Sequence, residues 1–360
     1  MTRFHQRAAV FCITGAVLLA ASSCTSLIFD DRSGCEHGLM MSFRYDYNLQ
    51  RADMFSGHVG EVTLYVFDEQ GRFVTSRTEG NTDAGSPLSE DGYSMYIDLP
   101  EGNYRFIALA QQGEYKDSAD EPGAQFIRNI PSEGEDITGL TVDLECTESR
   151  TDGNIITVNH GNMPLDTLWH GITEGTVNIP AEGGYAKAEM SLVRNTKNIT
   201  VVLQDLDNPG KSKVENYEFG ITDHNARLLY DNSVDGTDAV LYTPYATWNT
   251  SDSRPEAGTG DMAHAEFMTS RIIYHEDPDD DARLIVRERE SGIAVIDVNL
   301  PELLSRMAGY DELQRYEPQE FLDRGYDYDL TFFLSRKSWS YVTVNIETLG
   351  WSKRIQNINL

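Results

Sequence analysis

Side chains that could do chemistry are plentiful in this sequence, but few of them stand at a spacing that defines a site. The histidines are scattered singly, and none falls in the HExxH pattern that binds zinc from one helix face. The chain has no GxSxG, CxxC, Walker or GxGxxG motif. A glycosidase carboxylate pair depends on a separation that a sequence does not give. No catalytic residue and no cofactor is therefore predicted.

The densest group of candidate metal ligands is an acidic run at residues 275–281. Its carboxylates are of the type that binds calcium, but the run lacks the spaced ligands and the glycine of an EF-hand loop. We favour the alternative of a solvated hairpin tip and predict no metal site. The members of the run are His275, Glu276, Asp277, Asp279, Asp280 and Asp281.

Aromatic side chains offer a second kind of site. The chain has 18 Tyr, 14 Phe and 4 Trp. Tyr242, Tyr245 and Trp248 are close enough in sequence to form a platform for a sugar. The favoured alternative is that most aromatic residues alternate along strands and fill β-sheet cores.

The first 24 residues have the order of an export signal. Arg3 and Arg7 precede an uncharged, mostly apolar run, Ala8–Ala21, which is too short to span a bilayer. Small residues then lead directly to Cys24, an arrangement that resembles a bacterial lipobox, in which the new N-terminal cysteine is acylated. We predict a lipoprotein signal peptide over residues 1–23 and lipid on Cys24. The alternative is an ordinary secretory signal that ends at a cysteine by chance.

Two of the four cysteines remain once Cys12 leaves with the signal and Cys24 carries lipid. Cys35 and Cys146 would then be an even pair in an oxidising compartment, where a disulfide can form. The two alternatives are a bridge between them and two unpaired thiols.

The charge balance excludes one class of partner. The chain has 29 Lys and Arg against 58 Asp and Glu, a formal net charge of −29. Such a chain is repelled by phosphate backbones, so nucleic-acid binding is not expected.

Short β-rich runs separated by turn residues dominate from residue 39 onward. In one of them Val62, Leu64 and Val66 face one way, which is the period of a strand with one buried face. The charged segment Glu145–Asp152 is typical of a linker. We predict an all-β protein of two tandem β-sandwich domains, residues 39–150 and 151–360, after a lipidated tether at 24–38.

The second domain departs from this pattern in two places. One short helix is predicted near Pro301, where apolar residues fall at rough helical spacing. Tyr341–Thr348 is a strong β run, and it is followed by Trp351 and a polar tail, Ser352–Leu360. The tail is interpreted either as part of a docking surface or as a fraying end.

A train of short motifs, in order along the whole chain after the signal, resembles the FimB-type fimbrial anchor lipoproteins of Bacteroidales, which are minor fimbrial subunits. The motifs are Cys24, Asp30-Asp31-Arg32, Cys35, FRYDYN at 43–48, VTLYVFDEQGRF at 62–73, LPEGNYRFIALA at 99–110, LWHG at 168–171, MSLVRNTKNITVVL at 190–203, FLDRGYDYDLTFFL at 321–334, Trp339 and Gly350-Trp351.

This resemblance implies two transthyretin-like β-sandwiches, no enzymatic activity and attachment to the outer membrane through lipid on Cys24. It also implies a surface-exposed protein that is part of a fimbrium and is joined to stalk or accessory subunits by donor-strand exchange. Such a protein would anchor the fimbrium and limit its length. Which partner donates the strand is left open. The alternatives are a surface glycan-binding lipoprotein for nutrient capture and, less favoured, a secreted β-sandwich hydrolase.

Overall fold

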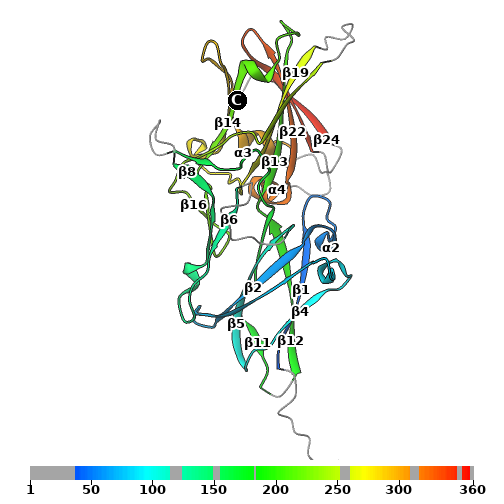
Figure 1. Cartoon of the computed structure of the whole chain (residues 1–360), viewed down its shortest axis with the longest axis vertical. Helices are drawn as coiled ribbons and strands as arrows, with labels where there is room; N and C mark the ends of the chain where they lie inside the picture. Colours follow the sequence, from blue (N-terminus) through cyan, green and yellow to red (C-terminus); the bar gives the residue numbers. More distant parts are fainter. Residues whose placement is uncertain are drawn as a thin grey trace, which may run out of the picture.

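A computed structural model describes residues 37–113, 124–148, 155–181, 184–251, 260–308, 316–346 and 351–356. The molecule is elongated and mostly β, with its first strands at the lower end of Figure 1 and its last strands at the upper end. Four sheets account for the strands of the described part of the chain. The prediction of a β-rich fold is therefore confirmed.

The lower sheet has eight strands in the order β3-β2-β5-β10-β12-β1-β4, with β11 beside β5. On β1 the residues Leu39, Met41, Phe43 and Tyr45 are buried, as their alternation requires. The strands of this sheet are β1 (His37–Tyr47), β2 (Glu61–Asp68), β3 (Phe73–Gly80), β4 (Ser94–Ile97), β5 (Gly102–Gln111), β10 (Leu168–Ile172), β11 (Val177–Ile179) and β12 (Gly184–Arg194).

The upper sheet of six strands has the order β18-β19-β13-β22-β23-β24. Tyr328, Leu330, Phe332 and Leu334 alternate along β22 and face the core, while the residues between them are partly exposed. The strands of this sheet are β13 (Lys197–Asp205), β18 (Ala246–Ser251), β19 (Asp261–Thr269), β22 (Asp327–Ser335), β23 (Ser338–Ile346) and β24 (Trp351–Gln356).

Two further sheets combine strands from both sides of residue 150. One has the order β21-β20-β14-β17-β9-β8 and the other β16-β15-β7-β6. Their strands are β6 (Phe126–Asn129), β7 (Thr141–Leu144), β8 (Cys146–Glu148), β9 (Ile156–Val158), β14 (Tyr217–Asp223), β15 (Arg227–Leu229), β16 (Val234–Asp235), β17 (Val240–Tyr242), β20 (Arg283–Glu288) and β21 (Ala294–Asn299). Strand pairing therefore does not follow the division at residue 150 that we expected from the sequence.

The buried side chains form two clusters. One fills the lower sheet between β1, β2, β5 and β12, and the larger one fills the space between the upper sheet and the two further sheets. β2 is buried on both faces, since Leu64 and Val66 belong to the first cluster while Tyr65 and Phe67 belong to the second. The two cores therefore share strands.

Helices are short, and the helical region after residue 299 differs from the prediction of one helix. Two helices lie there, α3 (Leu300–Ser305) and α4 (Pro318–Arg324), and residues 309–315 between them lie outside the described part. A proline stands in the first turn of each, where its missing N–H costs no hydrogen bond. A single turn, α2 (Phe55–His58), lies between β1 and β2. The 3₁₀ turns are η2 (Pro87–Ser89), η3 (Ile137–Gly139), η4 (Val214–Asn216) and η6 (Pro278–Asp280).

The polar tail that follows Trp351 is in part a strand, which bears on the alternative that this tail frays. Residues 351–356 form β24, which pairs antiparallel with β23 through six register positions. Ile355 is only 5% exposed and stands opposite Val342. The alternative of fraying is therefore wrong for residues 351–356, whereas residues 357–360 lie outside the described part.

Candidate functional site at the junction of two sheets

The chain crosses from the lower sheet to the upper sheet in two residues. β12 ends at Arg194 and β13 begins at Lys197, with Asn195 and Thr196 fully buried between them. The Asn195 N–H donates to the carbonyl of Leu168, at the start of β10, at 2.8 Å. The side chains of Arg194 and Lys197, on either side of this crossing, are therefore buried. Buried charged groups require hydrogen-bond partners or opposite charges.

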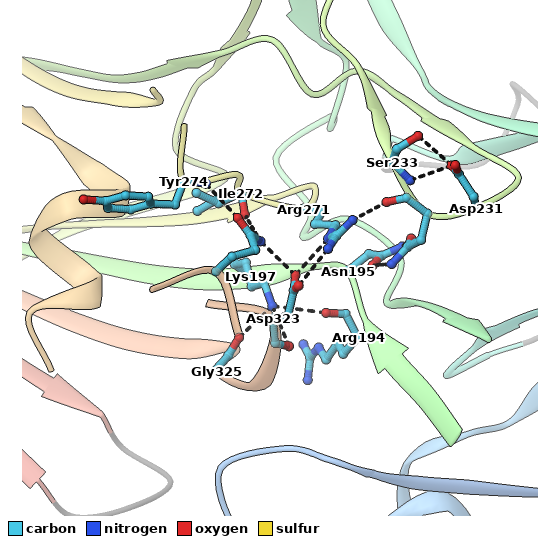
Figure 2. A network of polar contacts seen from close by, with 12 residues as sticks. Arg194, Asn195, Lys197, Asp231, Ser233, Arg271, Ile272, Tyr274, Asp323 and Gly325 are labelled. Carbon is cyan, nitrogen blue, oxygen red and sulfur yellow. Dashed lines mark hydrogen bonds and ion pairs between the residues drawn. The ribbon is translucent and has the colours of Figure 1, made fainter. Parts of the chain in front are cut away.

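Lys197 is fully buried, and its ammonium group has a complete set of acceptors. Nζ donates to the carbonyls of Gly325 at 2.7 Å, Arg194 at 3.1 Å and Asp323 at 3.2 Å (Figure 2). Three acceptors match its three protons. Burial nevertheless lowers the pKa of Lys197 to about 7, since the charged form is separated from water.

Arg271 and Asp323 form the ion pair beside it. The Arg271 fork donates from Nε to Oδ1 at 2.8 Å and from Nη2 to Oδ2 at 2.7 Å, and Nη1 donates to the carbonyl of Asn232 (Figure 2). Gln319, one turn earlier on α4, donates to the same carboxylate at 3.1 Å. The side-chain amides of Asn232 and Asn195 exchange hydrogen bonds at 2.7 and 3.1 Å. The Arg271–Asp323 pair therefore has further hydrogen bonds from the Asn232 carbonyl and the Gln319 side chain.

Aromatic rings surround the charged groups on the side of the lower sheet. The guanidinium of Arg194 lies 4.3 Å from the ring centroid of Tyr326 and 5.8 Å from that of Trp169, which packs edge-on against Tyr45. Burial lowers the pKa of Arg194 and raises the pKa of Tyr45. Cation–π contacts of this kind take the place of the water that the guanidinium loses.

A second stack joins the end of β1 to α4. The Arg324 guanidinium lies 3.9 Å from the ring centroid of Tyr47 and 5.0 Å from that of Tyr316, and it donates to Glu320 at 2.9 Å. Arg51, just after β1, donates to the Tyr316 hydroxyl at 3.0 Å. The first strand of the chain and a helix near its end are therefore held together.

His170 of the LWHG segment is fully enclosed beside this network. Its Nε2 lies 2.9 Å from the carbonyl of Tyr230, and burial lowers its pKa to about 4. In the described part of the chain no group of three or more His, Cys, Asp or Glu residues could hold a metal ion. The junction network is thus a structural clamp in which the polar groups face each other and backbone carbonyls.

Two of the residues singled out from the sequence lie outside the described part, Cys24 and Cys35. Cys146 lies on β8, half-buried, and burial raises the pKa of its thiol to about 12. The pairing of Cys35 with Cys146 stays a prediction.

The acidic run at 275–281 is used in local structure. Asp277 caps the 3₁₀ turn η6 by accepting from the Asp279 N–H at 3.1 Å. Asp281 is buried and accepts from the His275 N–H at 2.8 Å and from the Asn299 side chain at 2.7 Å. The carboxylates of Asp277 and Asp281 therefore stabilise the local backbone around η6.

The three rings considered as a platform for a sugar do not come together as one. Tyr242 is 1% exposed and its hydroxyl donates to Asn225 at 2.6 Å, so it belongs to the core. Tyr245 is half-buried, with its pKa raised to about 12 by burial and by Glu266. Trp248 is 37% exposed and stacks on His264 at 4.9 Å between ring centroids. The three rings therefore do not share one solvent-facing surface.

Sequence reasoning missed the junction network, although two of the quoted motifs supply most of it. MSLVRNTKNITVVL contributes Arg194, Asn195 and Lys197, and FLDRGYDYDLTFFL contributes Asp323 and Gly325. Only the first motif carries a signal, since Arg194 and Lys197 interrupt its apolar strand pattern as buried paired charges do, whereas Asp323 lies in helix α4.

These features define a β-sheet protein in which buried charged groups between two sheets are paired with one another and with backbone carbonyls. A family model described as "Fimbrillin-A associated anchor proteins Mfa1 and Mfa2" matches residues 32–357, and the chain belongs to this family. The family is one of fimbrial anchor proteins and is not a known enzyme family. The resemblance stated from the sequence is therefore confirmed.

Solved structures agree with this assignment. A proposed adhesin of Bacteroides thetaiotaomicron VPI-5482 is 31% identical, covers 89% of this chain and 99% of its own, and has a TM-score of 0.71. Proposed polysaccharide-binding proteins of the same organism give 29% identity, 89% and 99% coverage, and a TM-score of 0.69. The fimbrial anchor protein Mfa2 of Porphyromonas gingivalis, 15% identical over 88% of this chain and 98% of its own, shares the fold with a TM-score of 0.56.

No curated protein matches the chain. Among the described residues, no helix has both the length and the apolar character needed to cross a membrane. Membership of a fimbrial anchor family associates the protein with the cell surface and with fimbriae.

Proposed function

We propose that this protein is an outer-membrane lipoprotein that anchors a fimbrium to the cell surface. The observation that carries the proposal is the family match across residues 32–357. This range includes the lower sheet, the upper sheet and the junction between them. In this proposal each half is a transthyretin-like sandwich, and the mature chain begins at Cys24.

The arrangement of the sheets supports an anchoring role. β1 begins at the lower end of the molecule, where His37 stands opposite Gly184. The upper sheet, which contains β22 and β24, lies at the opposite end (Figure 1). A lipid attached shortly before β1 would leave the upper end pointing away from the membrane.

Lipid on Cys24 is the proposed attachment. A single acyl chain gives only marginal membrane binding, so two or three chains would be needed for a stable anchor. We expect a Cys24→Ala variant to incorporate no labelled palmitate and to leave the outer membrane. Palmitate labelling that survives in this variant would contradict the assignment.

The proposed joint with stalk or accessory subunits is strand addition. Edge strands offer unpaired backbone groups, and an added strand gains main-chain hydrogen bonds and places alternate side chains in pockets. An anchor that occupies the terminal position of the fimbrium in this way would also limit the length of the fimbrium.

The decisive experiment is the location of fimbriae in a deletion strain. Loss of the anchor should shed fimbriae into the medium, and complementation with the wild-type chain should return them to the cells. Fimbriae that stay on cells of the deletion strain would overturn the proposal.

Surface glycan binding is the second candidate, because a 29% identical relative is described as a proposed polysaccharide-binding protein. In this chain Trp248 is the ring to test, since it is exposed at an edge strand. Polysaccharide pull-down that is lost in Trp248→Ala, with fimbriae still on the deletion strain, would favour this second function.

A further inference from the structure

Strand β12 of the lower sheet is paired unequally on its two edges. On one edge β1 pairs with it through nine register positions. On the other edge β10 pairs only at Arg194 and Val193. Below Val193, no strand in the described part of the chain pairs with that edge, because β11 pairs with β5 instead.

A groove of about 740 Å³ follows this open edge. One wall is Ala188–Ser191 together with Val193 on β12, and the other wall is the segment Ile172–Val177, which leads from β10 into β11. The upper end of the groove reaches Arg271 and Asp323 of the junction network. We define this groove as the β12 slot.

The dimensions and lining of the slot suit an extended peptide. At about 3.3 Å per residue, the open stretch from 188 to 192 has room for a strand of about five residues. Ile172 is 39% exposed at the wall, and Val193 is partly exposed at the upper end of the slot, whereas Met190 is buried in the lower core. Open backbone groups beside apolar side chains are the two features that strand addition uses.

The charges around the slot select among extended segments. Glu174 is exposed on one wall and Asp231 lies on the other side, whereas Glu189 already pairs with Arg44. The cations nearby already have partners, because Arg271 pairs with Asp323 and Arg44 pairs with Asp46 and Glu189. A segment with alternating apolar residues and at least one Lys or Arg would complement this lining.

We propose that the β12 slot accepts an extended, Lys- or Arg-bearing segment of a stalk subunit, so that this chain is the acceptor of the added strand. The proposal rests on the proposed anchoring function and names the place and direction of its joint. The added strand would lie beside the junction network, and the load on the fimbrium would enter the protein at the clamp that joins its two sheets.

The test uses fimbriae shed by the deletion strain and the purified chain from residue 24 onward. Ile172→Asp places a charge in the slot, and Ile293→Asp is its matched control, because Ile293 is 48% exposed at the turn before β21. We expect Ile172→Asp to lose binding to sedimented fimbriae and Ile293→Asp to bind as the wild type does. Glu174→Lys should weaken binding as well. Thermal melting curves that match the wild type show that the variants are folded.

Photo-crosslinkers separate the slot from the other open edges. A probe at Thr176 should capture a stalk subunit, whereas a probe at Gln356 on β24 should not. Capture from Gln356 alone, capture of a second copy of this chain from Thr176, or normal binding by Ile172→Asp would overturn the slot while the anchoring function stands. If wild-type protein binds no shed fimbriae, the anchoring function and this inference both fail.

Discussion

The junction network and the β12 slot lie next to each other but differ in how their polar groups are satisfied. At the junction, Lys197 and Asp323 are buried, Arg271 has a side chain that is 15% exposed, and all three have partners within the chain. Along the slot, a backbone edge faces an open groove. The junction has completed its hydrogen bonds inside the chain, and the slot leaves a place for another chain. Binding can therefore occur beside the clamp without breaking it.

The largest expected effect comes from breaking the ion pair of the junction. Asp323→Ala leaves the largely buried Arg271 guanidinium, whose side chain is 15% exposed, without its carboxylate and should lower the free energy of unfolding by about 3–5 kcal/mol. Urea unfolding would measure the change.

The matched control for this variant is Asp297→Ala. It breaks the Arg283–Asp297 pair, whose side chains are 39% and 46% exposed, and should change stability by about 1 kcal/mol or less. Equal effects of the two substitutions would show that the junction is not the clamp described here.

The second expected effect is a pH dependence. Burial lowers the pKa of His170 to about 4 from 6.5, so between these values the unfolded chain binds more protons than the folded one. The contribution of His170 to stability should therefore fall as the pH drops from about 6.5 towards 4. For this group alone the loss is about 1–3 kcal/mol. His170→Gln should reduce the difference in urea midpoint between pH 7 and pH 5, and an unchanged difference would contradict the role of His170.

Much of the fold could be predicted from the sequence, because alternation along β1 and β22 reports one buried face directly. The short strands β6, β18 and β24 could not, since four to six polar or mixed residues give no clear period. The junction network was also beyond reach. It joins Lys197 to Asp323 across 126 positions, and only the strand order brings them together.

The third effect tests the edge of the upper sheet. Ile355 is buried on β24, so Ile355→Val should remove one methylene's packing and lower the free energy of unfolding by about 0.5–1.5 kcal/mol. The exposed residue Ile293 is the control, and Ile293→Val should change stability by about 0.5 kcal/mol or less. No difference between the two would mean that β24 contributes little to the fold in solution and is free to act as an edge for partners.

The smallest effect comes from the aromatic stack between β1 and α4. Arg324→Lys keeps the positive charge near Glu320 but loses the flat guanidinium that lies 3.9 Å from the Tyr47 ring centroid. The loss should be about 0.5–1 kcal/mol, measured by urea unfolding. Tyr47→Leu should then have a smaller effect in the Arg324→Lys variant than in the wild type, because the contact it removes is already weakened. Additive effects would show that Arg324 and Tyr47 are not coupled, so that the contact of Arg324 with the Tyr47 ring does not stabilise the joint between β1 and α4.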